Sequence, residues 1–287
     1  EQGREEIALA IDCAPSEVIF TASGTEANNL AVKGLFWNAG ATKRAILSSP
    51  IEHHAILDPL EWLEREHNVT LHLADVDSNG RTKVESVAQL LSEHQNEISF
   101  VTVMHSNNEV GALQPVEEIA AISREYKIPI HSDAVQSFGK VPLDFAKLGV
   151  NALTLSGHKI GGPLGVAALV AKKDLELTPL LHGGGQERDR RSGTHNVAGI
   201  VGSSIALSLT DQNRTSEVAR LGKLRDQLIH GITSRIECAT ATLAPGTGIA
   251  GTAHVCLENL ESESLLYLLD EARICVSAAS ACASGAM

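Results

Sequence analysis

Two residues near the middle of the chain, Lys159 and Asp133, have the types and spacing that amine-dependent chemistry needs. Lys159 follows an apolar run at 151–155 and precedes a glycine-rich turn, while Asp133 is the first acidic residue after the apolar run at 128–132. The stretch between them is long enough for one crossover between neighbouring parallel strands. Both side chains are therefore expected at the carboxyl ends of strands, where open α/β sheets bind their ligands.

An amine and a carboxylate at one sheet edge favour pyridoxal phosphate (PLP) as the cofactor. A lysine by itself is more often a solvated surface charge, and the carboxylate is what changes this interpretation. The amine can form a Schiff base with the cofactor's aldehyde, and the anion can keep the ring nitrogen protonated so that the ring withdraws electrons. The pair Lys159 and Asp133 therefore predicts a PLP site.

The segment Thr21-Ala-Ser-Gly-Thr-Glu-Ala-Asn-Asn follows a predicted strand and opens a predicted helix. Backbone N–H groups of Gly24 and Thr25, with the Thr25 hydroxyl, could hold a phosphate at such a helix N-terminus, although a plain helix cap is the simpler interpretation of this segment alone. The segment is not GxGxxG, which disfavours a nicotinamide cofactor.

Three further polar residues follow predicted strands and point to the same edge. His53 lies at a helix start and could stack on the pyridine ring, although a lone histidine is more often structural. Asn108 could bond the phenolic oxygen of the ring, and Gln136, one turn after Asp133, suggests the same role.

A glycine-rich loop at 182–194 carries three arginines and ends in Ser-Gly-Thr. This composition suits an anion, either the phosphate of this subunit or that of a neighbour. The glycines also resemble an esterase oxyanion hole, but no G-x-S-x-G motif accompanies them, so a hydrolase is disfavoured.

Among the five cysteines, Cys282 stands out because residues 277–286 are nearly all small. Such a segment has no side chain large enough to anchor it, and ten residues can extend over roughly 30 to 35 Å. We expect an exposed, mobile thiol that can move between a buried cofactor and the surface. The other thiols are expected to pack as small apolar groups: Cys13, Cys238, Cys256 and Cys275.

Bulk properties are those of a globular enzyme rather than a membrane or nucleic-acid-binding protein. The chain has 287 residues, 43% of them apolar, and a formal net charge of −12. No run approaches the ~20 apolar residues of a membrane span, and the acidic balance argues against a broad nucleic-acid surface. Five cysteines without a CxxC pair or metal-ligand spacing predict a reducing cytoplasm and no metal site.

Apolar runs alternate with amphipathic stretches up to about residue 170, which is the pattern of an α/β fold built from βαβ units. Strands are predicted at 17–21, 44–48, 69–73, 98–105, 128–132, 151–155 and 165–171. Helices are predicted at 25–38, 54–66, 84–93, 115–126, 195–209, 215–235 and 261–272. The polar stretch at 210–216 is the predicted junction between a large domain, 1–209, and a smaller α+β domain, 210–287.

With these residues assembled, the chain resembles the group I cysteine desulfurases of the class V aminotransferase superfamily. The resemblance implies PLP fold type I, with a mostly parallel seven-stranded sheet between helices. Seven blocks carry it, in this order: Thr-Ala-Ser-Gly-Thr-Glu-Ala-Asn-Asn, Glu-His-His-Ala-Ile-Leu, His-Ser-Asn-Asn-Glu-Val-Gly, His-Ser-Asp-Ala-Val-Gln-Ser, Ser-Gly-His-Lys, His-Gly-Gly-Gly-Gln-Glu and Ser-Ala-Cys-Ala-Ser-Gly.

The resemblance also implies roles for the candidate residues. Lys159 would hold the aldehyde, Asp133 the ring nitrogen, and Asn108 and Gln136 the ring oxygen, with His53 stacked on the ring. Thr25, Ser156 and His158 would contact the phosphate of the same subunit. Thr194 would reach the phosphate of the partner subunit in a homodimer.

Cys282 would take the sulfur of L-cysteine as a persulfide, with His53 or the bound substrate assisting its deprotonation, and pass it to an acceptor or iron-sulfur scaffold protein. Ala279 replaces a family glycine, and the arginine for the substrate carboxylate is expected beyond residue 287. A further N-terminal segment is expected as well. Two alternatives stay open: a selenocysteine lyase or related class V enzyme, and a non-catalytic scaffold that docks sulfur-acceptor proteins.

Overall fold

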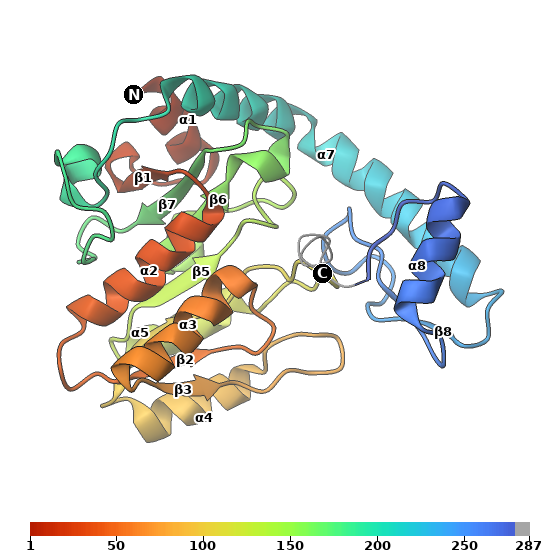
Figure 1. Ribbon diagram of the computed structural model, residues 1–287, viewed down its shortest axis with the longest axis horizontal. Helices are drawn as coiled ribbons and strands as arrows, with labels where there is room; N and C mark the ends of the chain where they lie inside the picture. The colour runs from red at the N-terminus through yellow and green to blue at the C-terminus, as the bar shows by residue number, and fades with distance from the viewer. Residues whose placement is uncertain (279–287) are drawn as a thin grey trace.

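The computed structural model describes residues 1–278, and Figure 1 shows a large α/β body joined by one long helix to a smaller lobe. Seven strands form the central sheet in the order β1-β7-β6-β5-β4-β2-β3. All pairings are parallel except those of β7, which runs antiparallel to both β1 and β6. The strands are β1 Val18–Thr21, β2 Ala45–Ser48, β3 Thr70–Leu73, β4 Ile98–Thr102, β5 Ile130–Asp133, β6 Ala152–Ser156 and β7 Ala167–Ala171.

These strands form because short runs of apolar and β-branched residues are buried on both faces of the sheet, as expected where helices cover both sides. Every residue of the six strands other than β3 is buried, and β3 is the partly exposed edge. Successive side chains point to opposite layers. In β2, for example, Ile46 packs in one apolar cluster and Leu47 in another.

The predicted seven-stranded, mostly parallel sheet is confirmed, with small differences at the strand ends. The strand predicted at 98–105 ends three residues early, at Thr102. Pairing nevertheless continues irregularly, because the N–H groups of Val103 and His105 donate to the carbonyls of His131 and Asp133.

Helices cover the two faces of the sheet as separate layers (Figure 1). Helices α2 and α3 supply the apolar clusters of one face, while α1, α4, α5, α6 and part of α7 contribute to the cluster on the other. The helices of this body are α1 Gln2–Ala10, α2 Gly24–Asn38, α3 His54–His67, α4 Val84–His94, α5 Val116–Glu125, α6 Phe145–Leu148 and α7 Val197–Thr233.

The prediction of two helices at 195–209 and 215–235 is wrong, because α7 is one continuous helix of 37 residues. The intervening polar stretch contains no glycine or proline that would break it. Its side chains instead bond within the helix: the guanidinium of Arg214 pairs with Asp211, and the Asn213 amide donates to the Leu209 carbonyl at 2.7 Å. Polar residues here cover an exposed helix surface rather than marking a loop.

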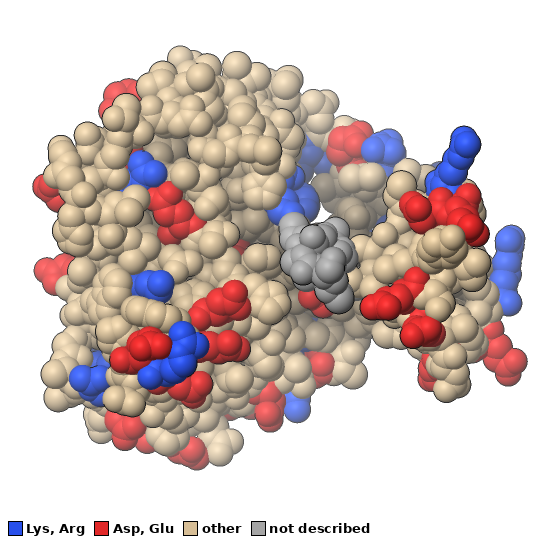
Figure 2. All heavy atoms as spheres, viewed as in Figure 1, with Lys and Arg blue, Asp and Glu red and all other residues tan. Residues whose placement is uncertain are grey.

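The lobe at the far end of α7 contains two short antiparallel strands and one helix: β8 Ala239–Ala241, β9 Val255–Leu257 and α8 Ser262–Glu271. The predicted boundary at 209 and 210 falls inside α7, and Figure 1 shows this helix extending from the body to the lobe. None of the helices within residues 1–278 is long and apolar enough to cross a membrane. On the face shown in Figure 2, acidic and basic side chains are interspersed.

Candidate active site

Asp133 lies at the carboxyl end of β5, near the middle of the sheet, and only 5% of its surface is exposed. Its carboxylate accepts hydrogen bonds from the Asn28 amide at 2.6 Å and the Val135 backbone N–H at 2.9 Å. Burial raises the pKa of Asp133, while these two donors and the charges of His53 and Lys159 oppose the rise. The carboxylate is therefore held by neutral donors, with cationic groups acting on it from a greater distance.

Lys159 lies just beyond β6, in the short 3₁₀ turn Gly157–Ile160, and is half-buried. Strands β5 and β6 are adjacent and parallel, with Asp133 opposite Thr154. Their carboxyl ends therefore meet at one edge of the sheet, as predicted, and the charge of Lys159 acts on Asp133 there. The sheet brings the predicted amine and carboxylate into one electrostatic environment.

The N-terminus of α2 lies against the end of β6. The Ser23 hydroxyl caps the helix by accepting from the Glu26 N–H at 3.0 Å, and the first N–H groups of a helix have no intrahelical partner. A Cβ atom added to Gly24 would lie 3.1 Å from a methyl group of Val135 and 3.9 Å from the Ser156 hydroxyl. The backbone therefore approaches this strand end closely, as a cradle for an anion requires.

Ser156 and His158 form one polar pair at this cradle, since the Ser156 hydroxyl lies 2.7 Å from Nδ1 of His158. Ser156 is buried, whereas His158 and Thr25 are exposed. Burial and the charge of Lys159 lower the pKa of His158. The start of α2, with Gly24 and Thr25, thus lies close to Ser156 and His158, which directly precede Lys159 along the chain.

His53 and Asn108 line one pocket of about 400 Å³, at the ends of β2 and β4. His53 is the cap of α3, and its Nδ1 accepts the Ala55 backbone N–H at 3.0 Å. This bond fixes the proton of a neutral His53 ring on Nε2, so the free edge of the ring is a hydrogen-bond donor. His53 also helps to lower the pKa of Asp133, which links this pocket to the end of β5.

Gln136 is half-buried, and its Oε1 accepts a hydrogen bond from Nζ of Lys140 at 3.0 Å. Because an ammonium group only donates, this contact directs the amide NH₂ of Gln136 away from Lys140 and leaves it as a donor. Burial and the charge of Lys159 lower the pKa of Lys140, so the two lysines are electrostatic neighbours.

The arginines of the loop at 182–194 do not form the predicted anion site, because each is engaged by protein acceptors. The Arg188 guanidinium donates to the Ser16 carbonyl at 2.7 Å, and that of Arg190 donates to the Lys173 carbonyl at 2.9 Å. Arg191 pairs with Glu26 at 2.7 Å. These side chains tie the loop to the body. Thr194, at its end, is exposed, and no described contact joins it to the other site residues.

A buried ion pair secures the same loop to α1. Arg4 donates two hydrogen bonds to Glu187, at 2.8 and 2.9 Å, and His195 also bonds the Glu187 carboxylate. Burial by itself would raise the pKa of Glu187, but the bonds and charges of Arg4 and His195 outweigh it and hold this pKa below its ordinary value. The loop is therefore clamped on both sides of its arginines.

The residues at the sheet edge fit PLP. Asp133 is a buried carboxylate that no lysine or arginine of residues 1–278 pairs with directly, and such a charge is costly unless a donor or cation satisfies it. Asn28 adds a buried Oδ1 atom that has no hydrogen-bond partner in the described part of the chain. A protonated ring nitrogen matches this environment, and the close backbone approach at Gly24 suits a phosphate.

Two residues at the site were not identified from the sequence as candidates. Asn28 lies on the face of α2 that meets Asp133, one turn beyond Gly24, and helical spacing within the Thr21-to-Asn29 motif is a signal that could have indicated it. Glu52 precedes His53 and is buried, for which the sequence carries no comparable signal. Cys282, the predicted sulfur acceptor, lies outside the described residues.

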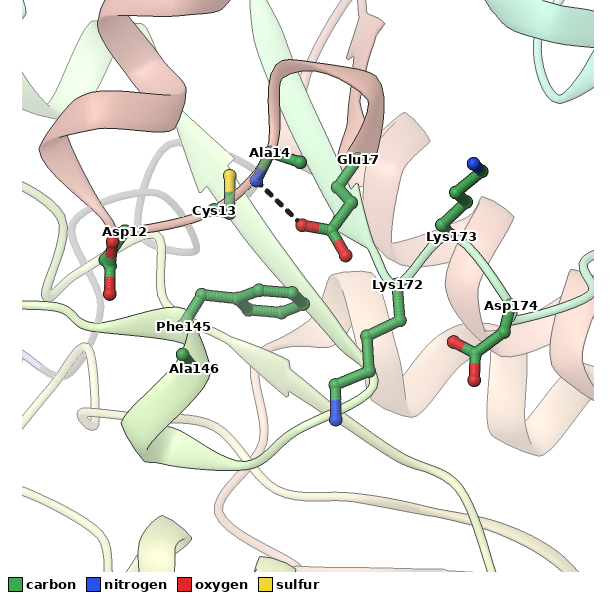
Figure 3. Close-up of a pocket in the computed structure, with 9 residues that line it drawn as sticks. All are labelled: Asp12, Cys13, Ala14, Glu17, Phe145, Ala146, Lys172, Lys173 and Asp174. Atoms are coloured by element: carbon green, nitrogen blue, oxygen red, sulfur yellow. Dashed lines mark hydrogen bonds between the residues drawn. The ribbon is translucent and has the colours of Figure 1, made fainter.

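The cavity shown in Figure 3, of about 680 Å³, is elsewhere in the body and contains a different thiol, Cys13, beside Phe145 and Lys172. Burial raises the pKa of Cys13 to about 12, and the charges of Glu17 and Asp12 add to this effect. A thiol in this state carries almost no thiolate at neutral pH. Cys13 also packs against the main apolar cluster, as its sequence interpretation predicted. The same prediction is wrong for Cys256 and Cys275, which are exposed.

The order of the strands and the polar residues at their carboxyl ends define a PLP-dependent transferase fold of type I. A solved NifS-like protein superposes with a TM-score of 0.89 at 34% identity, covering 96% of this chain and 74% of that one. A model of the family Aminotransferase class-V matches residues 1–287. The chain belongs to this class V aminotransferase family.

Its relatives include IscS-type and NifS-type proteins. The chain is 41% identical to an IscS-like cysteine desulfurase of Mycobacterium tuberculosis, over 99% of this chain and 73% of the relative. It is 37% identical to the cysteine desulfurase NifS of Azotobacter vinelandii, over 95% of this chain and 66% of that protein. A solved structure of SspA in complex with cysteine matches with a TM-score of 0.81 at 31% identity, over 99% of this chain and 78% of SspA.

Proposed function

We propose that the protein is a PLP-dependent cysteine desulfurase that converts L-cysteine to L-alanine and retains the sulfur as a persulfide on Cys282. The observation that carries the proposal is the meeting of Lys159 and buried Asp133 at the ends of adjacent strands, where the charge of one acts on the other. The names of the relatives and the bound cysteine in the SspA structure support this substrate.

In this proposal, residues of the sheet edge hold the cofactor at both ends of its ring. When bound, PLP supplies an electron-withdrawing ring that stabilises negative charge on the substrate. The Lys159 amine holds the aldehyde, and the Asp133 carboxylate accepts the N–H of the ring nitrogen. Gln136 and Asn108 donate to the ring oxygen, for which the Lys140 contact leaves the Gln136 amide suitably oriented.

The phosphate group of the cofactor is assigned to the cradle at the start of α2. Gly24 and Thr25 offer N–H groups at the positive end of a helix of 15 residues, and Ser156 and His158 offer polar side chains beside it. Thr194 is assigned to the phosphate of the partner subunit in a homodimer, since it is exposed and follows a loop that ion pairs hold in place.

The chemistry then requires one proton transfer and one sulfur transfer. The Lys159 amine would take the proton from Cα of cysteine and return a proton to the carbon skeleton. The Cys282 thiolate attacks the substrate sulfur, so that an S–S bond forms while the Cβ–S bond breaks. Thiol and cysteine together yield persulfide and alanine, so no external oxidant or reductant is consumed.

His53 is assigned next to the ring, with its Nε2–H as a donor. Because Nδ1 already accepts the Ala55 N–H, a neutral His53 has no free lone pair with which to take the Cys282 proton directly. This geometry favours the substrate-bound state, rather than His53, as the aid to thiol deprotonation.

A sulfur-acceptor or iron-sulfur scaffold protein is the proposed partner, and the cytoplasm is the proposed location. The four cysteines within residues 1–278 are all free thiols, which supports a reducing compartment. Alanine and sulfide would be measured after mixing the protein, PLP, L-cysteine and a thiol reductant. Equal amounts of both are expected, with a loss of both in Cys282→Ser, and sulfide release by Cys282→Ser at the parent rate would contradict the proposal.

A further inference from the structure

Glu52 is a buried acid that pairs with no cation of the described chain. It lies between β2 and α3, directly before His53, and 5% of its surface is exposed. Its Oε1 accepts the backbone N–H of Met104 at 2.6 Å, whereas Oε2 is buried and has no hydrogen-bond partner among residues 1–278. None of the ion pairs within residues 1–278 includes this side chain.

The Glu52 contact joins two loops that carry candidate site residues. Met104 begins the loop that leads to Asn108, and Glu52 belongs to the loop that presents His53. A second bond between the same loops runs from the Asn107 amide to the Ile51 carbonyl at 3.0 Å. Two cross-links thus fix the walls of the pocket that His53 and Asn108 share.

The charge of a second buried carboxyl group, Asp133, acts on Glu52 at this edge. The ionised form of Asp133 is stabilised by two N–H donors and by two basic side chains, whereas that of Glu52 is stabilised by one backbone donor. Burial raises the pKa of Glu52 well above its ordinary value, and the charge of Asp133 raises it further, against the Met104 bond. When the environments of two acids move their pKa values apart in this way, the acid whose anion is less stabilised keeps its proton.

We propose that Glu52 is a positioning residue that works as a neutral carboxylic acid: it holds the His53 and Asn108 loops together while leaving Asp133 as the single negative charge for the cofactor ring. The roles of His53 and Asn108 rest on the proposed function. The cross-link of Glu52 rests on its contact with Met104, and its protonation rests on its burial without a paired cation and on the nearby charge of Asp133.

The state of Glu52 can be tested by infrared spectroscopy of the full-length protein at neutral pH. The wild-type protein is expected to show an absorption band of a protonated carboxyl group that is missing in Glu52→Gln. Glu109→Gln is the matched control, because Glu109 is exposed at the rim of the same pocket and its replacement should leave the band in place. Identical bands in wild type and Glu52→Gln would overturn the proposal.

Cofactor binding provides the second readout. Glu52→Gln keeps a neutral acceptor for the Met104 N–H, whereas Glu52→Ala removes it, so we expect Glu52→Gln to bind PLP at least about tenfold more tightly than Glu52→Ala. Equal losses in both variants would contradict a neutral role. If Glu52→Ala does not fold, the infrared comparison still decides. That comparison requires neither cofactor nor cysteine, so its outcome is separate from the test of desulfurase activity.

Discussion

The amide nitrogen of Asn28 lies 2.6 Å from a carboxylate oxygen of Asp133, which ties the first turns of α2 to the end of β5. The same helix presents Gly24 against Ser156 at the end of β6. One helix therefore fixes the spacing between the proposed phosphate cradle and the carboxylate for the ring nitrogen. This relationship makes α2 the element that sets the length of the cofactor site.

Replacing Asn28 with alanine should weaken PLP binding by roughly 10-fold to 100-fold, because a hydrogen bond to a charged group contributes about 1.5 to 3 kcal/mol. Loss of the donor also makes ionisation of the buried Asp133 carboxylate less favourable. A titration of cofactor fluorescence or absorbance measures the dissociation constant. Asn29→Ala is the matched control, since the side-chain bond of Asn29 in the described part of the chain goes to the Thr25 carbonyl of its own helix. Equal effects in both variants would argue against the assignment.

Replacing Gly24 with alanine should lower phosphate and PLP affinity about tenfold, since the new methyl group would lie between the helix start and the Ser156 hydroxyl. The fold should tolerate it, because the Val135 methyl group, 3.1 Å from the added Cβ, needs to shift by only a few tenths of an ångström. Gly231→Ala in α7 is the control, as no other part of residues 1–278 comes within 4 Å of its added Cβ beyond the adjoining turns of its own helix. Unchanged affinity in Gly24→Ala would remove this cradle from the site.

Glu187→Gln should destabilise the protein by about 3 to 5 kcal/mol at neutral pH, because it leaves the buried Arg4 guanidinium without its anion. The pKa of Glu187 is lower in the folded state than in the unfolded state. Its contribution to the free energy of unfolding is therefore complete above the unfolded-state pKa of about 4.3, and it is lost as the pH falls through the folded-state pKa. The stability difference between wild type and variant should therefore narrow in acid.

Urea unfolding at several pH values measures this difference. Glu217→Gln is the control, because Glu217 pairs with Arg220 on the exposed surface of α7, where ion pairs contribute little. A constant difference between wild type and Glu187→Gln from neutral to acidic pH would show that ionisation of Glu187 does not stabilise the loop.

Cys13 should react far more slowly with iodoacetamide than the exposed Cys256, because its raised pKa leaves almost no thiolate near neutral pH. Peptide mass spectrometry after timed labelling gives both rates. Cys13→Ser should also leave alanine formation unchanged, since this thiol lies in the cavity of Figure 3 and not at the proposed site. Equal labelling of the two cysteines would refute the inert state of Cys13.

The sheet and its strand-end residues could be predicted because both follow from local patterns. Apolar runs of the right length give strands, and parallel strands place their carboxyl ends at one edge whatever the packing around them. This reasoning is sufficient to bring Asp133 and Lys159 together. It also indicates the start of α2, because a helix N-terminus after a strand has an intrinsic preference for anions.

The remaining features depend on partners that are distant in the sequence. Arg188 and Arg191 resembled an anion site because their acceptors, Ser16 and Glu26, lie far away along the chain. The protonation of Glu52 depends on burial, which no local pattern reports. The continuity of α7 through 210–216 depends on side-chain bonds within the helix that composition alone does not reveal.

The covalent attachment of PLP is the most direct test of the central claim. Full-length protein would be loaded with PLP, reduced with borohydride and digested, and the modified lysine would be identified by mass spectrometry. We predict that the cofactor mass is on Lys159, and that Lys159→Ala carries none while still folding. Attachment to the neighbouring Lys140, or no attachment at all, would contradict the assignment of Lys159 and Asp133 as the two groups that hold the cofactor.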